Sequence, residues 1–477
     1  MVFADLFFLF CFIPAFALVY LLACLIDLKL LKRGNAFRNW VLVVFSLLFY
    51  AWGEPVYVFL MLGCVLANFI FGRLIDRQDR FRKAALVCGV VFNLLVLCTF
   101  KYLGLIVGSI ASLGFEFKDP GLALPIGISF YTFQSISYLI DVYRREAKSQ
   151  RRFRDLLLYI SMFPQLIAGP IVRYDTIASE INERKVSSAD FAEGIFRFLT
   201  GLGKKVIIAN QLSEVVSSLL DSGLPSLSTS GAWVGILAFT LQIYFDFSGY
   251  SDMAIGMGRC LGFHFKENFD HPYCCTSITD FWRRWHISLG SFFRDYVYIP
   301  MGGNRRHQPF NILTVWMLTG IWHGASWNFL IWGLYFGLVI MTEKYTLLKI
   351  KDRIPSVFLH LYSLLLVTVG WGIFYFTDFG DMRSFFGVLF GHCGELTDIN
   401  AVSALQDRFW LWIAALVLCL PVRRFCSALL GKIFGNNSRM RRGMTVALKL
   451  AFAAAVLVLS ASLLVGATNN AFLYTRF

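Results

Sequence analysis

The sequence of 477 residues carries little charge. Asp, Glu, Lys and Arg make up only 16% of it, hydrophobic residues make up 57%, and the mean hydropathy is +0.63. A typical soluble domain has about 25% charged residues, so this composition excludes that class. Apolar segments long enough to cross a bilayer recur from Leu6 to Ala467, with no long polar insert between them. We therefore predict an all-α, polytopic integral membrane protein with about eleven or twelve transmembrane helices and additional interfacial or re-entrant helices.

The motifs of common soluble chemistries are also missing. The chain has no phosphate-binding P-loop, no dinucleotide fingerprint, no Gly-x-Ser-x-Gly element and no internal repeat. Most of its 11 cysteines lie inside apolar runs, and the adjacent pair Cys274 and Cys275 lacks the spaced ligands of a zinc or iron site. We predict reduced thiols and no metal.

Basic residues outnumber acidic ones, which gives a net charge of +14. These residues cluster at the ends of apolar segments, as the positive-inside rule expects of a membrane protein. We therefore predict contact with membrane lipid and no binding of nucleic acid.

The same clusters predict an orientation. The basic residues near positions 29–38, 73–83 and 144–154 place those loops in the cytoplasm, whereas the turns at 53–55 and 116–120 are poor in basic residues and are expected outside. The first apolar run continues past Leu25 without a cleavage site, so we predict a retained first helix and an external N-terminus.

One titratable side chain stands in a stretch without formal charge. Residues 311–342 contain no Asp, Glu, Lys or Arg, and His323 is their single histidine. In a soluble protein it would be interpreted as a hydrogen-bonded core residue. Within a bilayer a titratable ring is costly and is functional by default. Trp322 and Asn328 lie close to it in the sequence and are candidates for lining or orienting the site.

A second stretch, residues 277–304, combines paired charges with aromatic residues. It is too polar for an ordinary transmembrane helix and too aromatic for a solvated loop, so we expect it at or just inside the interface. In a helix, Asp280 would neutralise Arg283 or Arg284 and thereby orient Trp285 and His286. Asp295 is a further candidate of this stretch. The alternative is an anchoring helix whose histidine is incidental.

Taken together, these stretches resemble the membrane-bound O-acyltransferase family, in particular its bacterial branch of alginate O-acetylation proteins. Four further blocks match that branch in the same order: YAWGEP at 50–55, PIGISFYTFQ at 125–134, FPQLIAGPI at 163–171 and DFSGYSDMA at 246–254. The resemblance covers roughly residues 50–345. Gly290 stands where a serine is expected.

The resemblance implies one integral membrane domain, residues 1–477, with a central tunnel. His323 matches the essential histidine of the family and His286 its second polar position. A neutral imidazole suits removal of a hydroxyl proton near neutral pH, so His323 is the expected general base. His286 would either orient the acceptor or stabilise charge on the thioester oxygen. The resemblance also implies acetyl-CoA as the acyl donor.

The chain ends in a Phe-x-Tyr-x-x-Phe pattern, residues 472–477, after an apolar segment at 444–467 that is long enough for one crossing. The preceding basic cluster at 439–442 places the C-terminus outside. The pattern resembles the C-terminal motif of a small partner used by the D-alanyl transferase of the family. Tyr474 is therefore a candidate acyl relay; an aromatic anchor at the interface is the alternative.

The predicted function is the relay of acetyl groups from cytoplasmic acetyl-CoA across the bacterial inner membrane. The expected partner is a periplasmic or extracellular acetyltransferase subunit, and the expected final acceptor is a cell-surface or exported polysaccharide. The alternatives are a D-alanyl or lipid O-acyltransferase of the same family, and a proton-coupled transporter. A transporter would be expected to show inverted repeats, which this sequence lacks.

Overall fold

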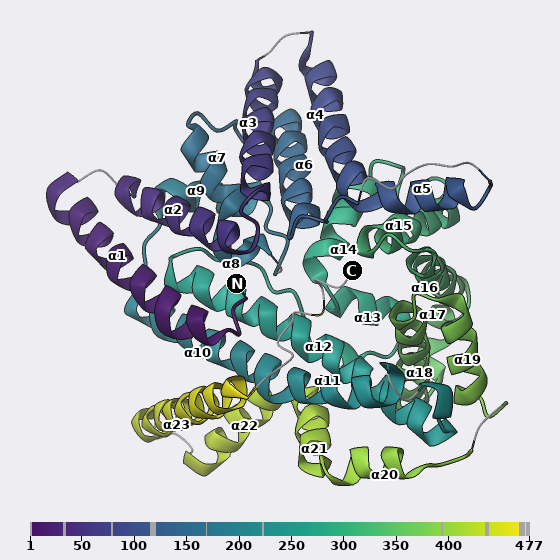
Figure 1. Cartoon of the computed structure of the whole chain (residues 1–477). Coiled ribbons are helices and arrows are strands. Elements are labelled where there is room, and N and C mark those ends of the chain that lie inside the picture. The colour runs from purple at the N-terminus through teal and green to yellow at the C-terminus, as the bar shows by residue number, and fades with distance from the viewer. Residues whose placement is uncertain are drawn as a thin grey trace. The chain divides into compact units, whose positions relative to one another are not determined.

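The computed structural model describes residues 2–31, 35–77, 80–114, 121–167, 169–221, 224–392, 395–434, 438–466 and 473. These residues form helices and connecting turns without any strand, which confirms the all-α prediction (Figure 1). The chain divides into two compact units. Of the described residues, one unit comprises those within 2–198 and 250–267, and the other comprises those within 199–249 and 268–473. The prediction of one integral domain stays a prediction.

The first unit is built from helices that bury one face each. Its helices are α1 (Ile13–Ile26), α2 (Ala36–Gly53), α3 (Tyr57–Asp76), α4 (Arg82–Leu97), α5 (Leu103–Ala111), α6 (Ile128–Arg144), α7 (Phe153–Ser161), α8 (Phe163–Leu166) and α9 (Tyr174–Glu183). Helix α3 packs against α4 and α6, and α2 packs against α1 and α7. The turn expected at 53–55 is present, because α2 ends at Gly53 and α3 begins at Tyr57.

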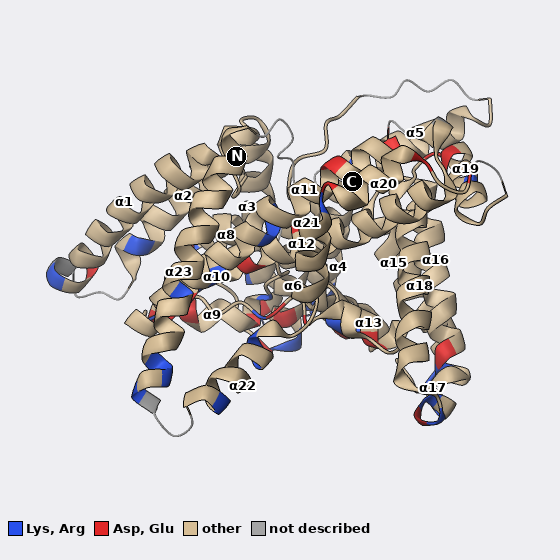
Figure 2. Ribbon diagram, turned by 90° about the horizontal axis from the view of Figure 1, so that it is seen from below, with Lys and Arg blue, Asp and Glu red and all other residues tan. Residues whose placement is uncertain are grey.

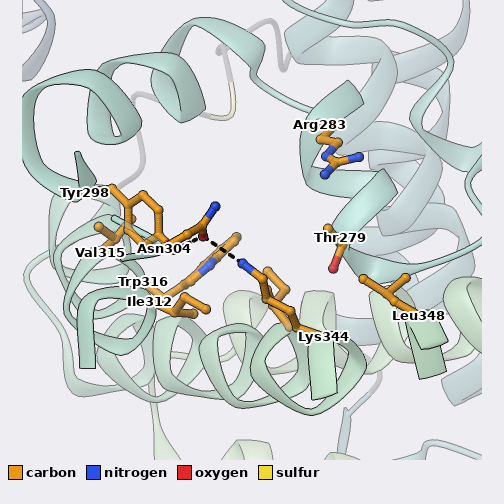
Figure 3. Close-up of a pocket in the computed structure, with 10 residues that line it drawn as sticks. Thr279, Arg283, Tyr298, Asn304, Ile312, Val315, Trp316, Lys344 and Leu348 are labelled. Atoms are coloured by element: carbon orange, nitrogen blue, oxygen red, sulfur yellow. Dashed lines mark hydrogen bonds between the residues drawn. The ribbon is translucent and has the colours of Figure 1, made fainter. Parts of the chain in front are cut away.

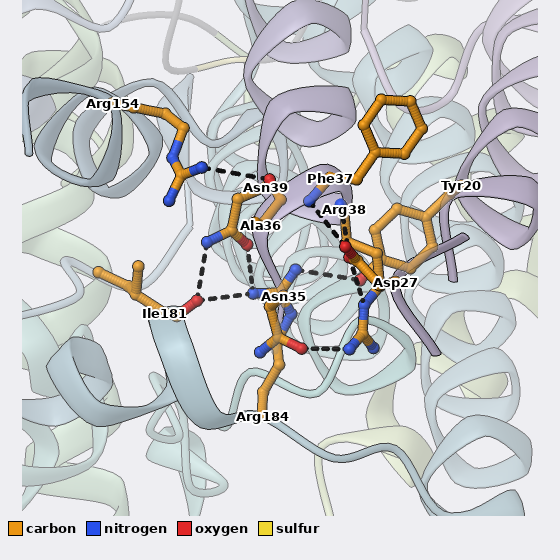
Figure 4. Close-up of polar contacts among 10 residues, drawn as sticks. All are labelled: Tyr20, Asp27, Asn35, Ala36, Phe37, Arg38, Asn39, Arg154, Ile181 and Arg184. Atoms are coloured by element: carbon orange, nitrogen blue, oxygen red, sulfur yellow. Dashed lines mark hydrogen bonds and ion pairs between the residues drawn. The ribbon is translucent and has the colours of Figure 1, made fainter. Parts of the chain in front are cut away.

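Buried charge holds the first two helices together (Figure 4). The Asp27 carboxylate accepts the backbone N–H groups of Phe37 and Arg38, at 3.0 and 2.9 Å, and pairs with the Arg38 guanidinium. These amides lie at the start of α2, where a helix has unsatisfied donors and favours a negative charge. Arg184 donates to Asn39 Oδ1 at 2.6 Å and to Ile181 O at 3.0 Å. Most buried polar groups of this region thus bind one another, although Asn35 Nδ2 and Arg184 Nε have no hydrogen-bond partner among the described residues.

The second unit contains most of the remaining helices. They are α11 (Asn210–Val216), α13 (Ile278–Arg284), α14 (Ile287–Phe293), α15 (Gln308–His323), α16 (Trp327–Tyr345), α17 (Leu347–Ile350), α18 (Ser356–Tyr375), α19 (Phe379–Leu389), α20 (Ile399–Gln406), α21 (Phe409–Leu418), α22 (Val422–Phe434) and α23 (Ser438–Val465). Helices α10 (Ser188–Gly203) and α12 (Thr229–Cys260) each contribute residues to both units.

The hairpin of α15 and α16 is the most closely packed element of the second unit. A Cβ at Gly320 would lie 2.2 Å from Phe329 O, and one at Gly333 would lie 2.3 Å from Trp316 O. Only glycine permits this approach of the two backbones. Charged residues gather at α17, whereas α15, α16 and α18 carry almost none along their length (Figure 2).

Six described helical segments are long and apolar enough to span a membrane, and a bent pair formed by α20 and α21 would be a seventh. The protein is thus a multi-pass membrane protein. The count of about eleven or twelve crossings, which rested on hydropathy alone, stays a prediction.

Candidate active site

Helix α13 presents the second histidine stretch, and its N-terminus is fixed by a buried carboxylate. Glu343, in the last turn of α16 and only 1% exposed, accepts the backbone N–H of Ile278 at 2.6 Å and that of Thr279 at 2.8 Å. It also accepts the Thr279 hydroxyl at 2.7 Å, and Ser277 caps the same helix through the N–H of Asp280. A negative charge at a helix N-terminus is stabilising. The position of α13 is therefore set by α16.

The predicted ion pair of this helix is present. Arg284 Nε lies 3.0 Å from Asp280 Oδ1, one helical turn away, and both side chains are partly exposed. Such a pair contributes only about 0.3–0.5 kcal/mol. It orients the end of the helix more than it stabilises the fold. The sequence left Arg283 and Arg284 as alternatives, and Arg284 is the one that pairs.

Trp285 follows α13 directly and is 3% exposed. Its ring lies 5.5 Å from that of Phe281, stacked on it, and 5.1 and 4.9 Å from the rings of Phe269 and Trp371. Aromatic contacts of this kind fix side-chain orientation. Trp285 thus anchors the chain immediately before His286.

The His286 backbone is in the left-handed region, with φ of 46°. This conformation is uncommon for residues other than glycine, although His, Asn and Asp adopt it more readily than most. Asn268 holds the turn, because its carbonyl oxygen accepts the N–H of Ile287 at 3.0 Å. Its side-chain oxygen accepts the Ser288 hydroxyl at 2.8 Å and the Ser288 N–H at 3.2 Å.

The same contacts assign the tautomer of His286. The two donors of Ser288 identify the contacting atom of Asn268 as the amide oxygen, which can only accept. His286 Nδ1 lies 3.1 Å from that oxygen and must therefore carry the proton. Nε2 is then the unprotonated nitrogen. It is buried and has no hydrogen-bond partner in the described part of the chain.

His286 forms part of the wall of a cavity of about 160 Å³. Trp282, Trp285, Trp316 and Gly290 also line it. Burial lowers the pKa of the imidazole below its ordinary value. The cavity therefore contains a neutral imidazole able to accept a hydrogen bond.

His323 is the last residue of α15 and is 5% exposed. The helix ends at His323, and the chain turns at Gly324. A Cβ at Gly324 would lie 2.1 Å from the Phe329 ring, so only glycine fits there. The imidazole lies 5.0 Å from the ring of Trp332 and 5.4 Å from that of Phe374. His323 thus stands at the sharp turn of a hairpin instead of within one long helix.

Trp322 connects the two histidines. Its ring centroid lies 5.9 Å from that of His286 and 5.1 Å from that of His323. Phe247, from α12, covers His286 at 4.6 Å with its ring perpendicular to the imidazole. The structure therefore gathers His286, Trp322 and His323 in one region. Their catalytic roles stay a prediction.

The remaining candidates occupy supporting positions. Asn328 donates to the carbonyl oxygens of Ile373 and Phe374, at 3.2 and 3.1 Å, and so fixes the backbone of an aromatic neighbour of His323. Asp295 pairs at 2.7 Å with Arg294, whose side chain lines the cavity of His286.

Tyr474 lies outside the described residues. The residue before it, Leu473, is described and donates its backbone N–H to Asp246 Oδ2 at 2.8 Å. The other oxygen of Asp246 forms a buried ion pair of 2.7 Å with Lys205. Asp246 precedes Phe247 on α12.

Sequence reasoning missed Asn268 and Glu343. Asn268 lies 18 positions before its partner His286, in a segment without a recognisable motif. Glu343 is the first charged residue after the stretch at 311–342, which is the available signal, but a charge at that position is expected to face water. In the part of the chain that is described, no group of three His, Cys, Asp or Glu side chains could hold a metal ion.

Comparison with known proteins identifies related chains. The sequence profile of MBOAT, the membrane-bound O-acyltransferase family, matches residues 144–377. The chain is 41% identical over 385 residues to the "Probable alginate O-acetylase AlgI" of Pseudomonas aeruginosa, which covers 78% of this chain and 72% of that protein.

Two relatives with other names are more distant. A "Peptidoglycan O-acetyltransferase" of Helicobacter pylori is 32% identical over 403 residues, covering 77% of this chain and 75% of that protein. A "Teichoic acid D-alanyltransferase" of Bacillus subtilis is 30% identical over 234 residues, covering 46% and 58%.

Proposed function

We propose that this chain, which belongs to the membrane-bound O-acyltransferase family and is an acyltransferase, relays acetyl groups from acetyl-CoA across the bacterial inner membrane for O-acetylation of a cell-surface or exported polysaccharide. The observation that carries the proposal is the His286 imidazole. This imidazole forms part of a cavity wall, and Asn268 fixes its tautomer. The chain that carries it is 41% identical to an alginate O-acetylase.

In the proposed reaction a hydroxyl oxygen attacks the thioester carbon, and His323 accepts the hydroxyl proton as the general base. The carbon–sulfur bond then breaks and the proton passes to the thiolate that leaves. His323 is buried among the rings of Trp322, Trp332 and Phe374, and an imidazole is the side chain best matched to a base acting near neutral pH.

Of the two roles considered for His286, orienting the acceptor and stabilising charge on the thioester oxygen, the structure favours the first. Stabilising negative charge on the thioester oxygen requires a donor, whereas the assigned tautomer leaves Nε2 as an acceptor. We therefore propose that the reacting hydroxyl donates its proton to His323, and that His286 orients the acceptor by accepting a hydrogen bond from another polar hydrogen of it. Trp322, which contacts both imidazoles, would line the place where the hydroxyl meets the thioester.

The two sides of the membrane would have different tasks. Acetyl-CoA is a cytoplasmic donor, and polysaccharides of this kind are modified outside, so a tunnel through the protein would join both faces. A separate periplasmic or extracellular acetyltransferase subunit would then pass the group to the polysaccharide. The basic loops after α3 and α6 support a cytoplasmic position for those ends and an external N-terminus.

The C-terminus is proposed to lie outside and Tyr474 to be the first acceptor. Support comes from Leu473, whose N–H is held by Asp246 in the unit that contains both histidines. A phenol that receives the acetyl group there could present it to the external subunit.

A D-alanyl transferase is the second candidate, because the chain also resembles the Bacillus subtilis D-alanyltransferase. That similarity covers 46% of this chain, against 78% for the alginate O-acetylase. Acetyl transfer is therefore the better supported reaction.

The test uses purified protein in lipid nanodiscs with radiolabelled acetyl-CoA, and follows both thiol release and label on protein or oligosaccharide. Wild-type protein should release thiol, and His323→Ala should reduce the rate by about 10²–10⁴-fold, the usual effect of removing a general base. The exposed His392 provides the control, since His392→Ala should be fully active. A stable His323→Ala protein with wild-type turnover would refute the proposed base. Acetyl transfer would be refuted if the wild-type protein were inactive toward acetyl-CoA but active with a D-alanyl carrier.

A further inference from the structure

A second cavity, of about 320 Å³, adjoins the cavity of His286. The two share Tyr298, Val315 and Trp316 as wall residues. The two cavities therefore meet at these three side chains. The inner cavity is mostly aromatic, whereas the second contains several hydrogen-bond donors.

The loop at residues 299–307 contributes Asn304 to the wall of the second cavity. Gly302 and Gly303 have φ of 109° and 55°, which glycine adopts without strain. Asn311, 1% exposed, donates to the carbonyl oxygens of Gly303 and Arg306 at 3.0 and 2.7 Å. These contacts hold Asn304 at the cavity wall (Figure 3).

Three donors converge on one neutral acceptor in this cavity. Asn304 Oδ1 accepts from Tyr298 Oη at 2.7 Å, from Gln308 Nε2 at 2.5 Å and from Lys344 Nζ at 3.0 Å. An amide oxygen has two lone pairs, so the site has more donors than this acceptor can satisfy. An anionic oxygen would be a stronger partner for the ammonium group.

The cavity also has unbalanced positive charge. Arg283 lies across it from Asn304 and, in the described chain, forms no ion pair (Figure 3). The residues that line the cavity include Arg283 and Lys344 but no carboxylate. The neighbouring Glu343 does not compensate, because both of its oxygens bind the N-terminus of α13. Burial, and then the charge of Arg283, lower the pKa of Lys344.

From this charge, these donors and the shared wall, we propose that Arg283 and Lys344 bind a phosphate group of the acyl donor while its thioester arm extends along Trp316 toward His286. This inference rests on the proposed function and adds the residues that would bind the phosphate of the donor. Arginine binds phosphate oxygens through its planar fork and lysine through its point charge.

The surroundings agree with a cytoplasmic entrance. Arg305, Arg306, Lys349, Lys351 and Arg353 flank the same ends of α15 and α16, and the positive-inside rule places such clusters in the cytoplasm. The phosphate of an anionic lipid headgroup has the same chemistry, so the experiment must separate the two sources.

The experiment compares Arg283→Gln and Lys344→Gln with wild-type protein in nanodiscs of neutral phosphatidylcholine. Calorimetry measures binding of CoA and of pantetheine, which has the same thiol arm without phosphate. Each substitution should weaken CoA binding by about 10-fold, as expected for the loss of one charged hydrogen bond. Pantetheine binding should not change. Lys349→Gln is the matched control, since Lys349 is exposed and lies outside the cavity wall.

The outcomes separate this inference from the proposed function. Unchanged CoA binding in both variants, with wild-type acetyl transfer intact, would overturn the phosphate site alone. CoA binding that depends on Arg283 and Lys344 in a protein without acetyl transfer would retain the site and refute the function. Equal loss of CoA and pantetheine binding would identify a merely structural effect. Binding of phosphatidylglycerol, in place of CoA, that depends on these residues would assign the cavity to a lipid headgroup and overturn the proposal.

Discussion

Replacing Asn268 with aspartate is expected to make acetyl transfer sensitive to acid. The carboxylate keeps an oxygen where the Ser288 donors and His286 Nδ1 need an acceptor, so the turn should persist. It also adds a negative charge beside the imidazole. An adjacent anion favours the protonated ring and raises its pKa, opposing the lowering caused by burial. Protonation at Nε2 would remove the lone pair that we propose orients the acceptor.

The size of the effect follows from the geometry. Nδ1 lies 3.1 Å from Asn268 Oδ1, and unit charges at that distance interact by roughly 5 kcal/mol at an effective dielectric constant of about 20, or about three to four pKa units. Burying the new carboxylate reduces this, so a rise of about two to three units is expected. From its lowered value of about 3, the pKa of the imidazole would then rise to roughly 5–6, so the ring gains its proton as pH falls below neutrality. Activity of the variant should fall more steeply than that of wild type on the acidic side and recover as pH rises.

The assay is the rate of thiol release from acetyl-CoA between about pH 4.5 and about pH 8 at matched protein levels, a range that brackets the raised pKa of His286. Ser288→Ala is the control, because it removes a donor to Asn268 without adding charge and should lower the rate without moving the profile. A profile for Asn268→Asp identical to that of wild type would refute the tautomer and the role assigned to His286.

Two further predictions concern the C-terminal contact. Tyr474→Phe should abolish polysaccharide acetylation at matched expression, because only the hydroxyl that could carry an ester is lost. A ring that merely anchors the chain at the interface would tolerate the change. Unchanged acetylation in cells would therefore exclude an obligatory Tyr474 intermediate. Asp246→Asn should destabilise the protein by about 3–5 kcal/mol, since it leaves the buried Lys205 ammonium without its ion-pair partner. Thermal unfolding in detergent measures this, with Lys205→Met/Asp246→Leu expected to regain stability, and an unchanged melting temperature for the single variant would contradict the pairing.

The sequence predicted those features that depend on local pattern. Hydropathy was sufficient for the all-α membrane class, since each span is decided by its own residues. The spacing predicted that Asp280 pairs with Arg283 or Arg284, because residues three and four apart are neighbours on a helix, and Arg284 is the partner. His323 was also identified from local sequence, because it is a titratable ring in a stretch, residues 311–342, that has no formal charge.

Features that depend on distant partners could not be predicted. Asn268 reaches His286 only because the left-handed turn folds the chain back onto it, and Glu343 binds an α13 terminus that lies 64 and 65 positions earlier. The break after His323 was also hidden, since a hairpin and a long helix have the same hydropathy. Glycine is needed at position 324 because Phe329 of the next helix packs against it, and the sequence does not show that contact.

The left-handed backbone at His286 limits what mutagenesis at that position can reveal. Alanine removes the imidazole and also forces a side chain poorly suited to φ of 46° into the turn, so its phenotype mixes lost chemistry with a distorted cavity. Asparagine tolerates the conformation and keeps a polar edge, and glycine adopts it without strain. The difference in rate between the asparagine and glycine variants therefore isolates the contribution of the side chain. If all amino acids are introduced at position 286 and active variants are selected, the residues recovered should be those that tolerate a left-handed backbone.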